Sequence, residues 1–145
     1  MKEFKHIPDL QLWPKEEEHV EYETVFRATK NEVDLSIDDF LPWNIEYANQ
    51  ERTFKNQFHR PKYGMSVFTE LDALISKIRK LPALKKKTRT ISKGKTTIER
   101  GISTKENVEH HVEYYLYDYE TNSPKDDFCI FISTEELEQM VNENE

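Results

Sequence analysis

Residues 63–80 constrain the fold more than any other stretch, because they predict a short strand that leads directly into a helix. The first part of the stretch holds Val and Phe, which favour strands, and Gly64, which permits close approach of another backbone. Further on, apolar side chains recur at helical spacing, at Leu71, Leu74, Ile75 and Ile78. Thr69 is suited to cap this helix. We therefore expect a strand over 63–68 and a helix over 69–80.

Four other segments carry the alternating or β-branched patterns of strands: 21–29, 87–103, 110–119 and 127–132. Shorter helical segments are expected at 36–41, capped by Ser36, and at 137–141, capped by Ser133 or Thr134. Together these elements predict a single α+β domain over residues 1–145, with a mixed, mostly antiparallel sheet and two or three helices. We expect a loosely ordered N-terminal arm (1–19) and an acidic C-terminal tail (142–145).

Several classes of protein are made improbable by composition. The one cysteine, Cys129, excludes an internal disulfide, and its apolar surroundings at 128–132 favour a small buried side chain on a central strand. No apolar run could cross a bilayer, and the first 20 residues lack the core of a signal peptide, so we expect no membrane contact and a cytoplasmic location. Adjacent His110 and His111 point to opposite faces of their strand, and no metal site is predicted.

Positive charge is concentrated in the middle of a chain whose net charge is −7. Residues 73–105 hold 11 lysines and arginines and one acidic residue. The basic region at 85–100, interpreted as part of a strand pair, could bind the phosphates of a nucleic acid or an acidic protein partner. Alternatively, it pairs with acidic segments of the same chain. The lack of interleaved aromatic residues argues against single-stranded nucleic acid as the partner.

The segment 110–119 is rich in tyrosine and alternates clearly. Val112, Tyr114 and Leu116 are expected to face the core. The other face would carry His111, Glu113, Tyr115, Tyr117 and Tyr119. On that face Glu113 is a candidate to hydrogen-bond a ribose or to act as a base, and equally an exposed partner for the basic strands. A further hypothesis is that the tyrosines contact another protein.

Three short motifs come in an order that resembles the core motifs of ADP-ribosyltransferase-like domains. They are Arg27-Ala28-Thr29 at the end of an early strand, Gly64-Met65-Ser66-Val67-Phe68 before a helix, and Glu113-Tyr114-Tyr115-Leu116-Tyr117-Asp118 on a late strand. In that superfamily, a basic residue or histidine on the first strand, with a following Ser or Thr, holds the ribose of NAD. The second motif lines the pocket for the nicotinamide, and the late glutamate polarises the ribose for transfer.

The resemblance implies NAD as the substrate and assigns roles to six residues. Arg27 and Thr29 would bind NAD, with Arg27 paired to the pyrophosphate. Gly64, Ser66 and Phe68 would line the pocket, and Glu113 would be the catalytic acid.

The chain departs from both branches of the superfamily. The histidine branch prefers Tyr at position 66, and the Ser-x-Ser and Glu- or Gln-x-Glu patterns of the arginine branch are not found. The Gly-x-Ser-Val-Phe strand also resembles that of small bacterial proteins of uncharacterised function, which imply no activity. A non-catalytic binding module that uses the basic region at 85–100 is the alternative.

Overall fold

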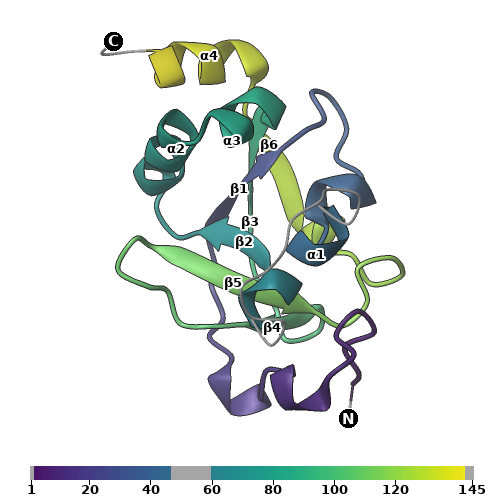
Figure 1. Cartoon of the computed structure of the whole chain (residues 1–145). Helices are drawn as coiled ribbons and strands as arrows, with labels where there is room; N and C mark the ends of the chain where they lie inside the picture. The colour runs from purple at the N-terminus through teal and green to yellow at the C-terminus, as the bar shows by residue number, and fades with distance from the viewer. Residues whose placement is uncertain (1, 47–59, 143–145) are drawn as a thin grey trace.

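The computed structural model describes residues 2–46 and 60–142. The strands are β1 (Val25–Thr29), β2 (Met65–Phe68), β3 (Thr90–Gly94), β4 (Gly101–Ser103), β5 (His111–Leu116) and β6 (Phe128–Ile132), and the helices are α1 (Trp43–Glu46), α2 (Leu71–Lys80), α3 (Pro82–Lys87) and α4 (Thr134–Asn142). The strands form one sheet in the order β4-β5-β2-β1-β3-β6, and every pairing described is antiparallel (Figure 1). The predicted α+β class is therefore confirmed.

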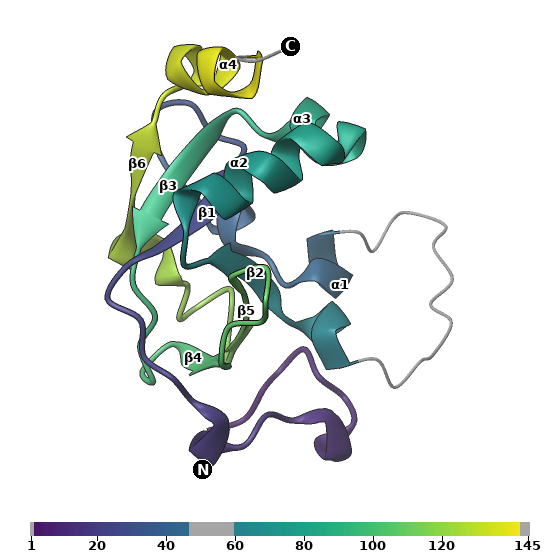
Figure 2. The same cartoon turned by 90° about the vertical axis from the view of Figure 1, so that its left-hand side faces the viewer.

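Each face of the sheet packs against its own hydrophobic cluster. One cluster joins the inward side chains of the strands to Phe40: Val25, Met65, Val67, Val112, Tyr114, Leu116 and Phe128. The other joins the sheet to α2 and α4: Phe68, Leu74, Ile75, Ile78, Ile91, Ile132, Leu137 and Val141. Because successive side chains of a strand alternate, β2 contributes to both clusters. Helices α1, α2 and α3 lie on the same side of the sheet (Figure 2).

Helix α2 buries Leu74, Ile75 and Ile78, as its spacing predicts, but its cap differs from the prediction. The N-cap residue is Glu70. The hydroxyl of Thr69 instead donates a hydrogen bond to Glu106, so this side chain is occupied by a distant loop. The N-cap thus lies one residue later than the sequence suggests, and the side chain of Thr69 makes a tertiary contact.

The basic strand pair predicted over 87–103 does not form. Residues 82–87 make helix α3, β3 pairs with β1 and β6, and β4 pairs with β5 on the far side of the sheet. Helix α3 lies in the upper half and strand β4 in the lower half of the molecule in Figures 1 and 2. The local pattern correctly indicates strands but carries no information about which strands they pair with.

Strand β6 lies at an edge of the sheet and not in its centre. Phe128 and Ile132 are buried, whereas the alternate residues Cys129 and Phe131 are exposed. The ammonium group of Lys93 lies 5.1 Å from the ring centroid of Phe131. The predictions of a central strand and of a buried Cys129 are therefore wrong, because one face of an edge strand can remain in water.

The N-terminal segment covers the tyrosine face of β5. Phe4 and Ile7 are buried in a third cluster with Tyr63, Ile102, Tyr115 and Tyr117. Tyr115 is 1% exposed and Tyr117 is 9% exposed. The hypothesis of an exposed tyrosine surface for protein contacts is thus wrong. The predicted inward face of the strand, Val112, Tyr114 and Leu116, is buried and is confirmed.

The two remaining helical predictions agree with the structure. Ser36 caps a short 3-10 helix, Ile37–Phe40, in a capping box with Asp39. Ser133 and Glu136 bond to each other at the start of α4. Residues 143–145 of the predicted acidic tail lie outside the described residues. No helix of the described part is long and apolar enough to cross a membrane.

Candidate functional site

The three strands that carry the motifs are neighbours in the sheet, in the order β5-β2-β1. Ser66 on β2 is the direct partner of Glu113 on β5. Direct partners on neighbouring strands point to the same face, so the hydroxyl and the carboxylate lie side by side. His111, two residues before Glu113, is opposite Phe68 and shares this face. Residues about 45 positions apart in sequence therefore meet on one surface.

Strands β1 and β2 are joined by a single described register pair, Phe26 with Phe68. We call the border between β1 and β2 beyond that pair the seam. The side chain of Arg27 bridges it: Nη1 donates to the carbonyl of Ser66 at 2.8 Å, and Nε donates to the carbonyl of Asp39 at 2.7 Å. Arg27 is 8% exposed. It therefore ties β1, β2 and the Ile37–Phe40 3-10 helix together beyond the one register pair of the two strands.

A pocket of about 490 Å³ opens at the seam and is here called the seam pocket. Its floor comes from strands β1, β2 and β5 and from the glycine before β2: Arg27, Ala28, Gly64, Ser66, Phe68 and His111. Its walls come from α1, α2, α3 and the loop before β5, and they include Trp43, Glu46, Leu74, Lys77, Leu84, Lys87, Asn107 and Glu109. The volume lies within the range of small-molecule sites. Four of the six residues implied by the resemblance thus line one pocket: Arg27, Gly64, Ser66 and Phe68.

Glu113 lies beside this pocket and contacts two of its lining residues. Its side chain is 20% exposed, and its Oε1 atom is 3.6 Å from Nδ1 of His111. A Cβ atom at Gly64 would lie 2.7 Å from Oε2, so a side chain at position 64 would displace this carboxylate. Burial raises the pKa of Glu113 to about 7, against the opposing positive charges of Arg60 and Arg27. A carboxyl group poised near neutrality is typical of catalytic acids and bases.

His111 is a site residue to which reasoning from the sequence assigns no role. Its Nε2 atom is 2.9 Å from the hydroxyl oxygen of Ser66. Burial lowers the pKa of His111, and the nearby charge of Lys77 lowers it further. Strand alternation places the ring on the same face as Glu113. Its contact with Ser66 depends on the pairing of β2 with β5, which no local pattern predicts.

Thr29 lies away from the seam pocket. Its hydroxyl is 2.7 Å from that of Thr90 and 2.9 Å from that of Ser92, and the residue is 1% exposed. Alternation places Thr29 and Arg27 on the same face of β1, opposite to that of Phe26. The long arginine side chain reaches the seam from this face, whereas the short threonine side chain bonds to the neighbouring strand. The structure therefore does not bring Thr29 together with the other implied residues.

The lysines at the rim of the pocket are paired with acidic side chains of the same chain. Lys77 lies 3.0 Å from Glu109, and Lys87 lies 3.0 Å from Glu46. Elsewhere in the basic region, Arg100 lies 3.0 Å from Asp127. These pairs fit the alternative that basic and acidic segments of the chain neutralise each other. The basic residues at 85–100 are spread from α3 to the start of β4 and share no single element.

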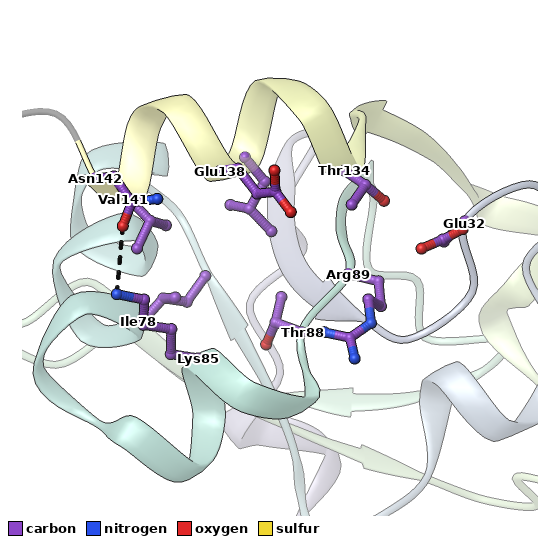
Figure 3. A pocket seen from close by; sticks show the side chains of 10 residues that line it. Glu32, Ile78, Lys85, Thr88, Arg89, Thr134, Glu138, Val141 and Asn142 are labelled. Atoms are coloured by element: carbon purple, nitrogen blue, oxygen red, sulfur yellow. Dashed lines mark hydrogen bonds between the residues drawn. The ribbon is translucent and has the colours of Figure 1, made fainter.

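A second pocket, of about 370 Å³, lies under α4 (Figure 3). Its charged lining residues have both signs, Lys85 and Arg89 against Glu32 and Glu138. Lys85 donates to the side-chain oxygen of Asn142 across one end of it, at 3.4 Å. None of the residues implied by the resemblance lines this pocket. The seam pocket is therefore the better candidate site.

The two adjacent histidines have separate environments. His110 has a φ of 63° and bonds through Nδ1 to Glu106 at 3.0 Å, whereas His111 faces the seam pocket. Within residues 2–46 and 60–142, no three His, Cys, Asp or Glu side chains gather as metal ligands. No family model, no curated protein and no solved structure matches the chain. The function must therefore be argued from the geometry of the site.

Proposed function

We propose that the chain is an ADP-ribosyltransferase-like domain that binds NAD in the seam pocket and transfers ADP-ribose from it. One observation carries the proposal. The three motif strands are consecutive in the sheet, with Ser66 opposite Glu113 and with Arg27 bonded to the carbonyl of Ser66. Four of the six residues that carry the resemblance line one pocket of suitable size, and Glu113 lies beside it.

The chemistry requires stabilisation of positive charge on the ribose. Loss of nicotinamide leaves an oxocarbenium-like sugar, and a nearby carboxylate stabilises charge that develops only in the transition state. Glu113 supplies this carboxylate, and its Oε2 atom lies next to Gly64 beside the pocket. Phe68 offers an aromatic surface on the pocket floor for the nicotinamide ring.

The pyrophosphate needs cations at the pocket. Arg27 lines the floor but donates to two backbone carbonyls, which restricts the direction of its guanidinium. Lys77 and Lys87 line the walls and add positive charge, and each lies beside a carboxylate. We therefore assign the pyrophosphate to the side of the pocket formed by α2 and α3, with Arg27 beneath it.

Calorimetric titration with NAD tests the binding step. Lys87→Ala is expected to weaken binding by about tenfold, the value of one lost charge-assisted contact. Lys86→Ala is the matched control, because it removes the same charge from the same helix at an exposed position outside the pocket lining. Equal affinities for the two variants, or no binding of NAD at millimolar concentration by the wild type, would contradict the proposal.

Release of nicotinamide tests the chemical step. Glu113→Gln is expected to keep NAD binding and to lose turnover, because glutamine has the same shape without the charge. Glu120→Gln, an exposed substitution beyond the end of β5, serves as the control. Unchanged turnover in Glu113→Gln would refute the role of this carboxylate.

The alternative of a binding module for nucleic acid or an acidic protein has less support. Lys87 and Arg100 are paired with carboxylates of the same chain, and β3 lies inside the sheet between β1 and β6. A steep loss of nucleic-acid affinity with added salt would favour this alternative.

A further inference from the structure

His111 lies between the two side chains that flank the proposed reaction, and the proposed function gives it no role. Its Nε2 atom is 2.9 Å from the hydroxyl oxygen of Ser66. Its Nδ1 atom is 3.6 Å from Oε1 of Glu113. The ring centroid is 5.1 Å from that of Phe68, and the residue lines the seam pocket. The imidazole is thus the polar group that links the pocket floor to the carboxylate.

The surroundings of the ring decide which nitrogen carries hydrogen. Burial lowers the pKa of His111, so the ring is neutral near pH 7 and has one N–H group. The carboxylate of Glu113 near Nδ1 favours the tautomer with hydrogen on Nδ1. The lone pair of Nε2 then accepts the hydrogen bond that the Ser66 hydroxyl donates. A ring nitrogen that accepts from a hydroxyl has the geometry of a general base.

We propose that His111 is the general base of the transfer reaction and that the acceptor of ADP-ribose is a hydroxyl group, of water or of an alcohol. This inference rests on the proposed function. The acceptor oxygen forms a bond to the anomeric carbon of the ribose, while the bond from that carbon to nicotinamide breaks. The electron pair of the broken bond stays on the nicotinamide nitrogen, which loses its positive charge. The acceptor hydroxyl takes the place of the Ser66 hydroxyl at Nε2 of His111, and its proton passes to that nitrogen.

The chemistry of imidazole selects the class of acceptor. A guanidinium group has a pKa above about 12 and keeps its proton beside a neutral imidazole. A hydroxyl group becomes far more acidic as its oxygen bonds to a cationic carbon, and a base with a pKa near or below neutrality can then remove the proton. The contact with Ser66 shows that a hydroxyl fits against Nε2.

The test uses the full chain with NAD and two small acceptors, methanol as an alcohol and agmatine as a guanidine, with products identified by mass spectrometry. The wild type is expected to form ADP-ribose from water and the methyl riboside from methanol, and no agmatine product. His111→Asn is expected to lower both rates by about a hundredfold or more while NAD affinity changes by less than about twofold.

His110→Asn is the matched control. His110 bonds to Glu106 outside the seam pocket, and asparagine tolerates its φ of 63°. Free imidazole added to His111→Ala is expected to restore part of the rate, which a purely structural role of the ring would not allow.

The outcomes separate this inference from the function on which it rests. Intact NAD binding with unchanged turnover in His111→Asn, or transfer to agmatine, would overturn the role of His111 and leave the proposed function standing. Absence of NAD binding by the wild-type chain would overturn both. A far-ultraviolet circular dichroism spectrum identical to that of the wild type ensures that a slow variant is folded.

Discussion

Replacing Glu113 by glutamine is expected to stabilise the protein above pH 7, although the residue belongs to the candidate site. Burial raises the pKa of this carboxyl group from its ordinary value of 4.5 to about 7. Between these two values the folded state binds a proton that the unfolded state releases. The free energy of unfolding therefore falls as the pH rises through this window, and above pH 7 the whole penalty is present.

The magnitude follows from the size of the pKa difference. Each tenfold change in proton affinity corresponds to about 1.4 kcal/mol, so burial of the ionised carboxylate costs about 3 kcal/mol above pH 7. Glutamine has nearly the same shape and no charge at any pH. The Glu113→Gln variant is thus expected to match the wild type at pH 4.5 and to exceed it by up to about 3 kcal/mol at pH 8.

Urea denaturation of both proteins at pH 4.5, 6 and 8 gives the measurement, because all other titrating groups cancel in the difference between them. Glu109→Gln is the control: this carboxylate is exposed, and a hydrogen bond from Lys77 lowers its pKa, so its removal should not stabilise the protein at pH 8. A difference between Glu113→Gln and the wild type that is the same at all three pH values would refute the burial argument. The same variant separates stability from activity, since it should be more stable and inactive.

Three further substitutions test the packing around the site by urea denaturation. Asp39→Ala is expected to cost about 3 kcal/mol at neutral pH, because the buried carboxylate accepts hydrogen bonds from three backbone N–H groups and one amide side chain. Although burial opposes them, these hydrogen bonds lower the pKa of Asp39, so this cost should shrink as the pH falls below 4. Tyr114→Phe should cost about 1–2 kcal/mol by removing the hydroxyl that bonds to both the N–H and the carbonyl of Thr97; no loss would contradict this. Gly64→Ala should cost about 1–3 kcal/mol and slow nicotinamide release, because the new methyl group displaces Glu113; unaltered release would contradict it.

Local patterns in the sequence are sufficient to predict the elements but not their pairing. The apolar spacing of Leu74, Ile75 and Ile78 predicts helix α2, and alternation predicts which side chains of β5 face the core. A short apolar run does not distinguish an edge strand from a central one, so it does not reveal the exposure of Cys129. The cap of α2 differs from the prediction because Thr69 bonds to Glu106, a residue that no local rule connects to it.

The sequence groups some residues of the candidate site in one hypothesis, but it predicts neither their geometry nor the presence of His111. The order of the motifs along the chain is enough to group Arg27, Ser66 and Glu113 in one hypothesis. Their actual meeting depends on the neighbouring positions of β1, β2 and β5, which result from long-range pairing. Helix α3, which the sequence does not predict, forms directly before the segment 87–103 expected to hold strands, and it places Lys87 on the pocket wall. The periodicity of the sequence does not predict which distant elements contribute residues to the pocket.

The seam between β1 and β2 has a consequence for motion in the protein. With one described register pair between them, the halves β4-β5-β2 and β1-β3-β6 share few ladder hydrogen bonds. Amide hydrogen exchange should therefore resolve these halves as two cooperative opening units. Within each half, the amides away from the seam should exchange more slowly than the amides along it. A dinucleotide bound across the seam would contact both halves and hold them together. It would slow exchange in both halves together, far beyond the amides that it touches.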